Sequence, residues 1–477
     1  MEVRIMTFRL MFGALTAFSL LVGEVGLSNV ASARDETLSE TPISVVSKED
    51  IERIVDQRLE EILSRTPQNT PPTDFSQTPG LGQTSHTQQR IQKGSRDVMT
   101  GGNVLQGGRT IYAKPFVRAP KTILGGYMDF TISDCNNAGS RDCSEGLEFD
   151  QERFVPFFYS QVTDRLSIAT ELEVEHGGPQ GNQKDGDIKI EFATMDYRFE
   201  DWLNLRAGII LIPIGRFNLI HDSPLNDLPL RPMVSRLIIP STFAESGVGF
   251  FGTVYPTQLS KVDYEFYVTQ GFDGGMSSGG TTSITENNGV RKSRGSFKSD
   301  NNENKAVVSR VSVSPFLGIE VAGSVHHGKW DDERDHYMTI WAVDGLIQRG
   351  PFELLGEAAW TKIRGGSKNP DPANGIPPKR MEGYYVQANY HFMPEILTRM
   401  APTHFGDSST FTAIVRWGEA DTNSHSNNNV NDLQRLTLGF NFRPVEDSVL
   451  KFAWTFNDHK DDPQSRNGWQ MSWATYF

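Results

Sequence analysis

Apolar and polar side chains alternate along much of the chain that follows residue 120. Between residues 449 and 457 every second side chain is large and apolar, in the order Leu450, Phe452, Trp454 and Phe456. Successive side chains of a β-strand point to opposite faces, so this period of two predicts a strand with one apolar and one polar face. We expect the apolar faces to contact lipid and the polar faces to line a hydrated interior.

The same pattern predicts sixteen strands, over residues 121–133, 147–163, 165–177, 187–200, 202–215, 246–256, 262–274, 304–315, 317–330, 336–350, 351–365, 382–394, 409–421, 432–444, 448–458 and 467–477. Short connections alternate with long ones rich in Gly, Asn and Ser, such as 275–303, 366–380 and 422–431. The connection 394–408 is an exception, because it is long for the short-turn side. Short turns on one side and long loops on the other are typical of an all-β fold, a transmembrane antiparallel β-barrel.

The composition supports a barrel with a wet interior. Hydrophobic residues make up only 37% of the chain, whereas aromatic residues reach 10%. A polar lumen on every second strand position and aromatic girdles on the outer wall account for both values. The 46 Lys and Arg residues against 59 Asp and Glu residues give a net charge of −13, which argues against a nucleic-acid partner because its phosphates would be repelled.

The first residues have the form of a secretory signal. Arg4 and Arg9 precede an apolar run over residues 10–23, and the small residues 31–33 resemble a cleavage site, which predicts a signal peptide over residues 1–33. No later segment has the roughly 18 consecutive apolar residues that a spanning helix needs. Any membrane crossing by the mature chain is therefore expected to use strands.

Residues 34–65 contain a predicted helix over 47–64, which Ser47 would cap. Apolar residues follow at helical spacing, namely Ile51, Val55, Leu59 and Ile62. So short a helix is marginal alone in water, and two arrangements are open: a coiled coil between protomers, or a helix that docks on the barrel mouth or frays. Residues 66–108 are predicted to be a flexible linker, and residues 109–477 the barrel.

The segment 216–245 separates two predicted strands and is unusual for a surface loop. Its proline content disfavours a helix or a central strand, and its apolar content is too high for a solvated loop. A loop of this kind between two barrel strands is best accommodated by folding into the lumen, which it narrows. The charged candidates of this constriction loop are Arg216, His221, Asp222, Asp227, Arg231 and Arg236.

The inward strand faces carry charges of both signs. Glu171, Glu173 and Glu175 are same-face neighbours, and only a hydrated face readily tolerates carboxylates about 7 Å apart. Besides these three, the expected pore lining includes Lys189, Glu191, Arg310, Arg416, Arg435, Arg443 and Lys451. The separation of the two signs predicts a transverse field across the constriction and modest ion selectivity.

Two cysteines lie close together in a predicted external loop. Cys135 and Cys143 are separated by small and polar residues, and an exported chain meets an oxidising compartment. We predict a disulfide between them, the alternative being two free thiols in a loop.

The final strand carries a further signal. Trp469, Met471, Trp473 and Phe477 share one face, and Phe477 is the terminal residue. This arrangement is similar to the assembly signal of bacterial outer-membrane barrels, which is read by their insertion machinery. We expect the barrel to lie in the bacterial outer membrane, with the N-terminal helix in the periplasm.

One stretch carries a resemblance to a known family. Residues 205–216, Leu-Arg-Ala-Gly-Ile-Ile-Leu-Ile-Pro-Ile-Gly-Arg, end a strand in a hydrophobic-Pro-hydrophobic-Gly turn, and Pro240 and residues 245–249 restart the next strand. With its terminal Phe477, the chain from about Gly108 onward resembles the phosphate-selective porin O/P family and related trimeric outer-membrane porins. The resemblance implies sixteen strands, a homotrimer, a third loop folded into the channel and, in some members, anion binding by lysines and arginines.

These features predict a porin, a water-filled channel for passive diffusion of small hydrophilic or charged solutes, including anions such as phosphate. One alternative is a structural anchor that links the barrel to the periplasm through the 47–64 helix. The other is an outer-membrane barrel enzyme, for which the only conspicuous cluster is His221-Asp222-Ser223. Adjacent residues in a proline-rich loop do not form a relay merely by being neighbours, so we expect no enzyme.

We also expect no cofactor and no metal. His326 and His327 are successive strand residues, which point to opposite faces and cannot chelate one ion. The expected partners are outer-membrane lipid, further copies of this chain, the insertion machinery during assembly, and the permeating solutes.

Overall fold

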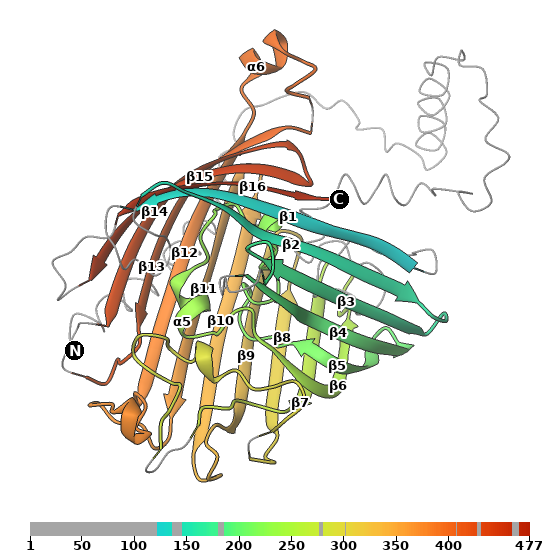
Figure 1. Ribbon diagram of the computed structural model, residues 1–477. Helices are drawn as coiled ribbons and strands as arrows, with labels where there is room; N and C mark the ends of the chain where they lie inside the picture. Colours follow the sequence, from blue (N-terminus) through green and yellow to red (C-terminus); the bar gives the residue numbers. More distant parts are fainter. Residues whose placement is uncertain are drawn as a thin grey trace, which may run out of the picture. The chain divides into compact units, whose positions relative to one another are not determined.

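Sixteen strands form one closed barrel in the computed structural model, which describes residues 122–135, 146–179, 186–275, 280–300, 302–406, 408–426, 431–459 and 467–477 (Figure 1). The strands are β1 (Thr122–Cys135), β2 (Glu148–Gln161), β3 (Leu166–Glu175), β4 (Asp187–Glu200), β5 (Leu203–Leu211), β6 (Ala244–Val254), β7 (Lys261–Thr269), β8 (Ala306–Ser314), β9 (Ile319–Lys329), β10 (Tyr337–Arg349), β11 (Phe352–Ile363), β12 (Arg380–Phe392), β13 (Thr410–Asp421), β14 (Asp432–Val445), β15 (Ser448–His459) and β16 (Gly468–Tyr476). Each strand pairs with its sequence neighbour, and the predicted antiparallel barrel of sixteen strands is confirmed.

The first and last strands close the ring. Tyr127 lies opposite Tyr476 in the antiparallel register of β1 and β16. Beyond the end of β16, the backbone N of Phe477 donates to the backbone O of Gly126 at 2.9 Å, and the ring of Phe477 stacks on Phe154 with centroids 5.7 Å apart. Because every strand has two neighbours, the closed ring has no free edge.

The outer wall is apolar, as the alternation predicts. On β15, Leu450, Trp454 and Phe456 are exposed, whereas the intervening Lys451 and Thr455 are buried. A band of exposed apolar side chains around a closed barrel fits the hydrocarbon of a membrane. Among the described residues, no helix is both long and apolar enough to cross one.

The connections differ between the two ends of the barrel. Most connections at the end with the β14–β15 turn are short, as predicted, but the one between β12 and β13 contains a helix, α6 (Glu395–Met400), which Figure 1 shows projecting beyond the strands. Pro394 is the N-cap of α6, and an ion pair at 2.8 Å joins Arg399 to Glu395 one turn earlier. The helix explains why this connection is longer than the other turns on its side.

The chain turns into the barrel after β5. The predicted strand 202–215 is shorter in the structure, because β5 ends at Leu211 and Pro213 cannot donate a ladder hydrogen bond. Residues 212–243, which we call the inner loop, contain the 3₁₀ helix η1 (Ser223–Leu225) and the short helix α5 (Met233–Leu237). Figure 1 shows α5 inside the ring of strands.

Part of the interior is a dry core. Buried inward side chains of β8 to β13 cluster with the inner loop, among them Val308, Met338, Ile340, Ala359, Ile363, Met381, Tyr385, Met233, Val234, Leu237 and Ile238. The expectation that the inward faces line a hydrated interior therefore does not hold for this part of the wall. The inner loop supplies the apolar partners that a water-filled lumen would lack.

The signal peptide over 1–33, the helix over 47–64 and the linker over 66–108 lie outside the described residues. They stay predictions.

Candidate functional site

Asn218 ties the two ends of the inner loop together. Its side-chain amide donates to the backbone oxygens of Ile212 and Phe243, at 2.7 and 3.0 Å. Its side-chain oxygen accepts from the backbone N of Phe243 at 2.8 Å and from Ser241 Oγ at 3.1 Å. Asn218 is fully buried, so a rotation of its amide would leave buried groups without partners. The base of the inner loop is therefore held in one geometry.

Basic side chains of the wall fasten the middle of the inner loop. Lys451 on β15 donates to both the backbone O and the Oγ of Ser223, at 2.7 Å each. Arg443 on β14 donates to the backbone O of Pro224 at 2.8 Å and pairs with Asp227 at 3.3 Å. These two predicted pore-lining cations are buried beneath the loop. They hold the loop rather than face open water.

A third wall cation acts in the same way. Arg416 on β13 is buried and donates to the backbone O of Leu230 at 2.8 Å and to Gln387 Oε1 at 3.0 Å. Asp227 of the loop also accepts from Asn441 and Asn389 of the wall, at 3.0 and 2.8 Å. The predicted loop residue Asp227 is therefore an anchor of the inner loop.

The remaining basic candidates lie elsewhere on the wall. Arg310 on β8 forms a buried bidentate pair with Asp344 on β10, at 2.6 and 2.8 Å. Arg435 on β14 donates to Asn457 Oδ1 at 2.6 Å. Charge-assisted pairs of this geometry fix both partners, so each of these arginines is occupied within the wall.

Acidic wall residues hold the start of the inner loop. Glu357 on β11 accepts a hydrogen bond from the backbone N of Phe217 at 2.8 Å. Arg216, a predicted loop candidate, pairs with Glu320 on β9 at 3.2 Å. The loop is thus fastened to several separate strands.

His221, Asp222 and Ser223 turn to three different partners. His221 contacts Glu191 of β4 through Nε2 and the backbone O of Asn218 through Nδ1, whereas Asp222 accepts from the hydroxyl of Tyr476 at 2.9 Å. Ser223 bonds the wall lysine described above. The three side chains form no relay.

The described part of the loop between β7 and β8 (residues 270–275, 280–300 and 302–305) also folds inward. The sequence indicates a polar external loop, but the backbone N of Val290 donates to the backbone O of Leu237 in α5 at 3.2 Å, and Phe272 stacks on Phe243 with centroids 4.9 Å apart. Gly289 makes this contact possible. Its φ is +57°, and a Cβ there would lie 1.8 Å from the backbone O of Leu237. The β7–β8 loop therefore covers the inner loop on the long-loop side.

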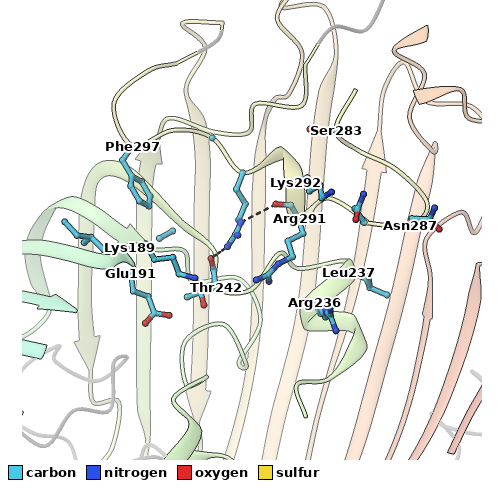
Figure 2. Close-up of a pocket in the computed structure, with 15 residues that line it drawn as sticks. Lys189, Glu191, Arg236, Leu237, Thr242, Ser283, Asn287, Arg291, Lys292 and Phe297 are labelled. Carbon is cyan, nitrogen blue, oxygen red and sulfur yellow. Dashed lines mark hydrogen bonds between the residues drawn. The ribbon is translucent and has the colours of Figure 1, made fainter. Parts of the chain in front are cut away.

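A pocket of about 840 Å³ lies between the two loops and the β4 wall (Figure 2). Its charged lining residues are Lys189, Glu191, Arg236, Arg291, Lys292 and Arg294, and we call it the basic pocket. Five of these six are cations. They come from β4, α5 and the β7–β8 loop, and Figure 2 shows the side chains of Lys189, Arg236, Arg291 and Lys292 around the pocket.

Arginines in and beside this pocket crowd one another. Arg294 donates to the backbone O of Thr242 at 2.5 Å, and Arg291 donates to the backbone O of Ser241. Burial, together with the charges of Arg294, Arg231 and Arg236, lowers the pKa of the Arg291 guanidinium. Burial and the charge of Arg231 likewise lower the pKa of Arg294. A bound anion would relieve this repulsion, so the arrangement suits anion binding.

The row of glutamates on β3 is partly neutralised. Glu173 pairs with Arg153 of β2 at 3.1 Å and with Lys189 at 2.8 Å, and Glu175 pairs with Lys189 at 3.0 Å. Glu171 and Glu173 are buried, and Glu175 is half-buried. The sequence pattern indicated an acidic arc, but Arg153 and Lys189 sit within it. The field of this arc is weaker than three free carboxylates would give.

The ends of the wall carry the other candidates. Met471, Trp473 and Phe477 are exposed on the outer face, and Trp469 is half-buried there. Cys135, at the end of β1, is disulfide-bonded. Cys143 lies outside the described residues, so the predicted pairing with Cys143 stays a prediction.

Sequence reasoning missed Arg291, Lys292 and Arg294, because they lie in a loop taken to be external. A signal was present: three of the four residues 291–294 (Arg-Lys-Ser-Arg) are basic, within a stretch otherwise rich in Gly, Asn and Ser. It missed Arg153 as well, since that strand was not assigned an inward face.

Comparisons with known proteins give one family match. The model of the family described as phosphate-selective porin O and P matches residues 164–472. An uncharacterized protein of Aquifex aeolicus is 26% identical over 328 residues, which are 65% of this chain and 71% of that protein. Among solved structures, the outer membrane channel DcaP of Acinetobacter baumannii is 13% identical, with a TM-score of 0.47 over 75% of this chain and 97% of that one. The anion-selective porin from Comamonas acidovorans is 12% identical, with a TM-score of 0.46 over 75% and 99%.

Proposed function

The chain belongs to the phosphate-selective porin O and P family and is a channel of the bacterial outer membrane, and from this premise we propose that it conducts small anions, phosphate among them, past the basic pocket. The observation that carries the proposal is the charge of this pocket, five cations against one carboxylate around about 840 Å³. Clefts lined by one sign of charge concentrate counter-ions and steer them inward.

The route of the solute through the barrel can be inferred by comparing the inward faces of β8–β13 with those of β2–β4. The inward faces of β8 to β13 pack against the inner loop partly through buried apolar side chains, and inward charged groups of this wall, such as Arg310, Glu320 and Arg416, are paired within the wall or with the loop. On the opposite side, β2 to β4 carry Arg153, Glu173 and Lys189. We infer that solute passes along the β2–β4 side, where Lys189 and Arg236 face the same pocket.

The selectivity should be moderate. Arginines bind phosphate oxygens by charge-assisted hydrogen bonds, which favours phosphate over solutes without such acceptors. Glu173, Glu175 and Glu191 lie close to the same path and oppose the field of the arginines. A site with both signs gives a channel that prefers anions and still passes cations.

The proposed partners complete this account. A homotrimer is the assembly that the family resemblance implies, and the exposed apolar wall supplies surface for contact with lipid or with other copies.

The test is the reversal potential in a salt gradient across a planar bilayer. The variant R291Q/K292Q/R294Q should shift the reversal potential toward cations relative to the natural chain. The matched control is K298Q/K305Q/R334Q, which removes three positive charges from the long-loop side outside the pocket and should shift it less. K292Q alone, which spares the bonds of Arg291 and Arg294 to the inner loop, should give a smaller shift in the same direction. Equal shifts in the pocket variant and its control would refute the proposal.

A further inference from the structure

A row of outward-facing polar and basic residues crosses four neighbouring strands near the long-loop end of the barrel. His327 of β9 lies opposite Thr339 of β10, Thr339 opposite Lys362 of β11, and Lys362 opposite Arg380 of β12. We call these four residues the outer basic row. Three of them are exposed and Thr339 is half-buried, whereas the intervening Met338, Ile363 and Met381 are buried against the interior.

Aromatic residues mark the level of this row in the membrane. Trp341 and Trp360 lie opposite each other on the same outer face, two residues from Thr339 and Lys362 on the side of the barrel's middle. Trp341 is 42% exposed. Tryptophan on a membrane protein collects at the level of the lipid headgroups, and two residues of strand span about 7 Å. The outer basic row therefore lies at or just beyond the headgroup level, on the outside of the wall.

The same face continues outward with basic and aromatic groups. Lys329 lies opposite Tyr337, with its Nζ 5.3 Å from the ring centroid, and His327 stacks on Tyr337 with centroids 5.1 Å apart. Lys329 is half-buried and Arg364, which follows β11, is exposed. Lys329, Arg364 and Arg380 thus surround Lys362 or extend its row, on the wall of a chain whose net charge is −13.

Other parts of the rim differ. Near the long-loop end, β1 carries Asp134 and β13 carries Glu419 on the outer face. Glu382 lies on the outer face of β12, two residues from Arg380 toward the middle of the barrel. It lies opposite Trp360 of the neighbouring strand β11, two residues from Lys362. The positive charge near β9–β12 is therefore not a property of the whole rim.

We propose that the outer basic row binds anionic phosphate groups of membrane lipids in the leaflet on the long-loop side. Charge complementarity and position identify this occupant. The row spans three inter-strand gaps, about 14 Å, which is wider than one phosphate group, and the tryptophans below it contact the apolar part of the same lipids. This binding is separate from conduction, because the row faces away from the lumen.

The experiment uses the purified full-length chain in mild detergent, with phosphatidylglycerol and phosphatidylcholine in equal amounts, and native mass spectrometry to count the bound lipids. The variant K362Q/R380Q should lose its preference for the anionic lipid about 30-fold, since each basic residue near an anionic surface contributes about 1 kcal/mol and 1.4 kcal/mol is tenfold. The control K368Q/K379Q removes two exposed positive charges outside the row and should keep the preference. Unchanged single-channel conductance shows that each barrel is intact.

Two results would overturn the proposal. One is an equal preference in K362Q/R380Q and in its control. The other is full displacement of the bound lipid by 10 mM inorganic phosphate. Screening is weak at so low a salt concentration, because the Debye length at 0.01 M is about 30 Å. Displacement would therefore show that the row binds free phosphate and not lipid. If the double variant does not fold, K362Q alone carries the test, with an expected loss of about five-fold by the same constants.

Discussion

Lys451 Nζ lies 2.7 Å from both oxygens of Ser223, the backbone O and the side-chain Oγ, although the two residues are 228 positions apart in sequence. A buried cation on the wall thus satisfies two acceptors of the inner loop at one point. The contact joins β15, near the end of the chain, to a loop that leaves the wall at β5. Its strength decides how firmly this part of the loop stays in place.

Replacing Lys451 by Met should loosen the inner loop around η1. Each buried group left without its partner costs about 1–3 kcal/mol, and Met fills similar space without a donor. We expect faster hydrogen–deuterium exchange over residues 222–226 and noisier single-channel current. Lys261→Met is the matched control, because Lys261 is also a buried wall lysine but pairs with Asp263 of its own strand at 2.6 Å. Equal exchange over 222–226 in both variants would contradict the anchoring role.

Replacing Gly289 by Ala should detach the β7–β8 loop from α5. The new Cβ would lie 1.8 Å from the backbone O of Leu237, and the φ of +57° adds roughly 1–2 kcal/mol of backbone strain. Gly350→Ala is a close control, since Gly350 has the same φ of +57° with no atom near the added Cβ. The amide of Val290 should exchange faster only in the Gly289 variant. Faster exchange in neither variant, or in both, would show that the contact between residue 289 and Leu237 does not hold the β7–β8 loop on α5.

Charges on the two sides of the conduction path should act in opposite directions. Replacing Arg231 and Arg236 by Gln should move the reversal potential toward cations, and replacing Glu171, Glu173 and Glu175 by Gln should move it toward anions. The second change also releases Arg153 and Lys189 from their carboxylate partners. Both shifts should shrink at 1 M salt, where the Debye length is about 3 Å. If neither set moves the potential, these residues do not line the path.

The chain is expected to form a homotrimer that withstands mild detergent. Deleting residues 34–106 should weaken the trimer without abolishing it, because most of the contact would be between barrel walls. Analytical ultracentrifugation of the purified chain measures this directly. A monomer in mild detergent would rule the trimer out.

Replacing Cys135 and Cys143 by Ser should leave barrel assembly nearly intact. A disulfide that closes so short a ring removes little entropy from the unfolded chain, so the loss of stability should be at the low end of the range of about 2–4 kcal/mol. The temperature at which the barrel unfolds in detergent measures this loss of stability. Mass spectrometry that finds both cysteines alkylated without prior reduction would contradict the predicted pairing.

The barrel itself could be predicted because its signal is local. The period of two is a property of each strand alone, and β4 (Asp187–Glu200) has the bounds that the pattern predicts. Strand β5 is shorter than predicted, since the apolar residues Ile212 and Ile214 continue the pattern but belong to the inner loop and its buried core. Hydrophobicity alone does not distinguish an apolar residue of a strand from an apolar residue of the buried inner loop.

The site could be predicted only in part. Alternation places Lys451, Arg443 and Arg416 on the inward face, but whether an inward residue meets water or a folded loop depends on the path of that loop through space. The β7–β8 loop shows the same limit. Its polar composition indicates solvent, whereas Ile284 and Val290, two isolated apolar residues in this loop, are fully buried.

The bonds of Asn218 to Ile212 and Phe243 close the inner loop at its base, whatever lies between. The tip of the loop is nevertheless tied to the wall, because buried Arg443 and Arg416 donate to the backbone oxygens of Pro224 and Leu230. A segment grafted in place of residues 224–238 should therefore keep the form of the barrel only if it offers an acceptor to each of these two cations and refills the apolar core around α5. The lumen and the wall of such a channel must then change together in evolution, one side compensating the other.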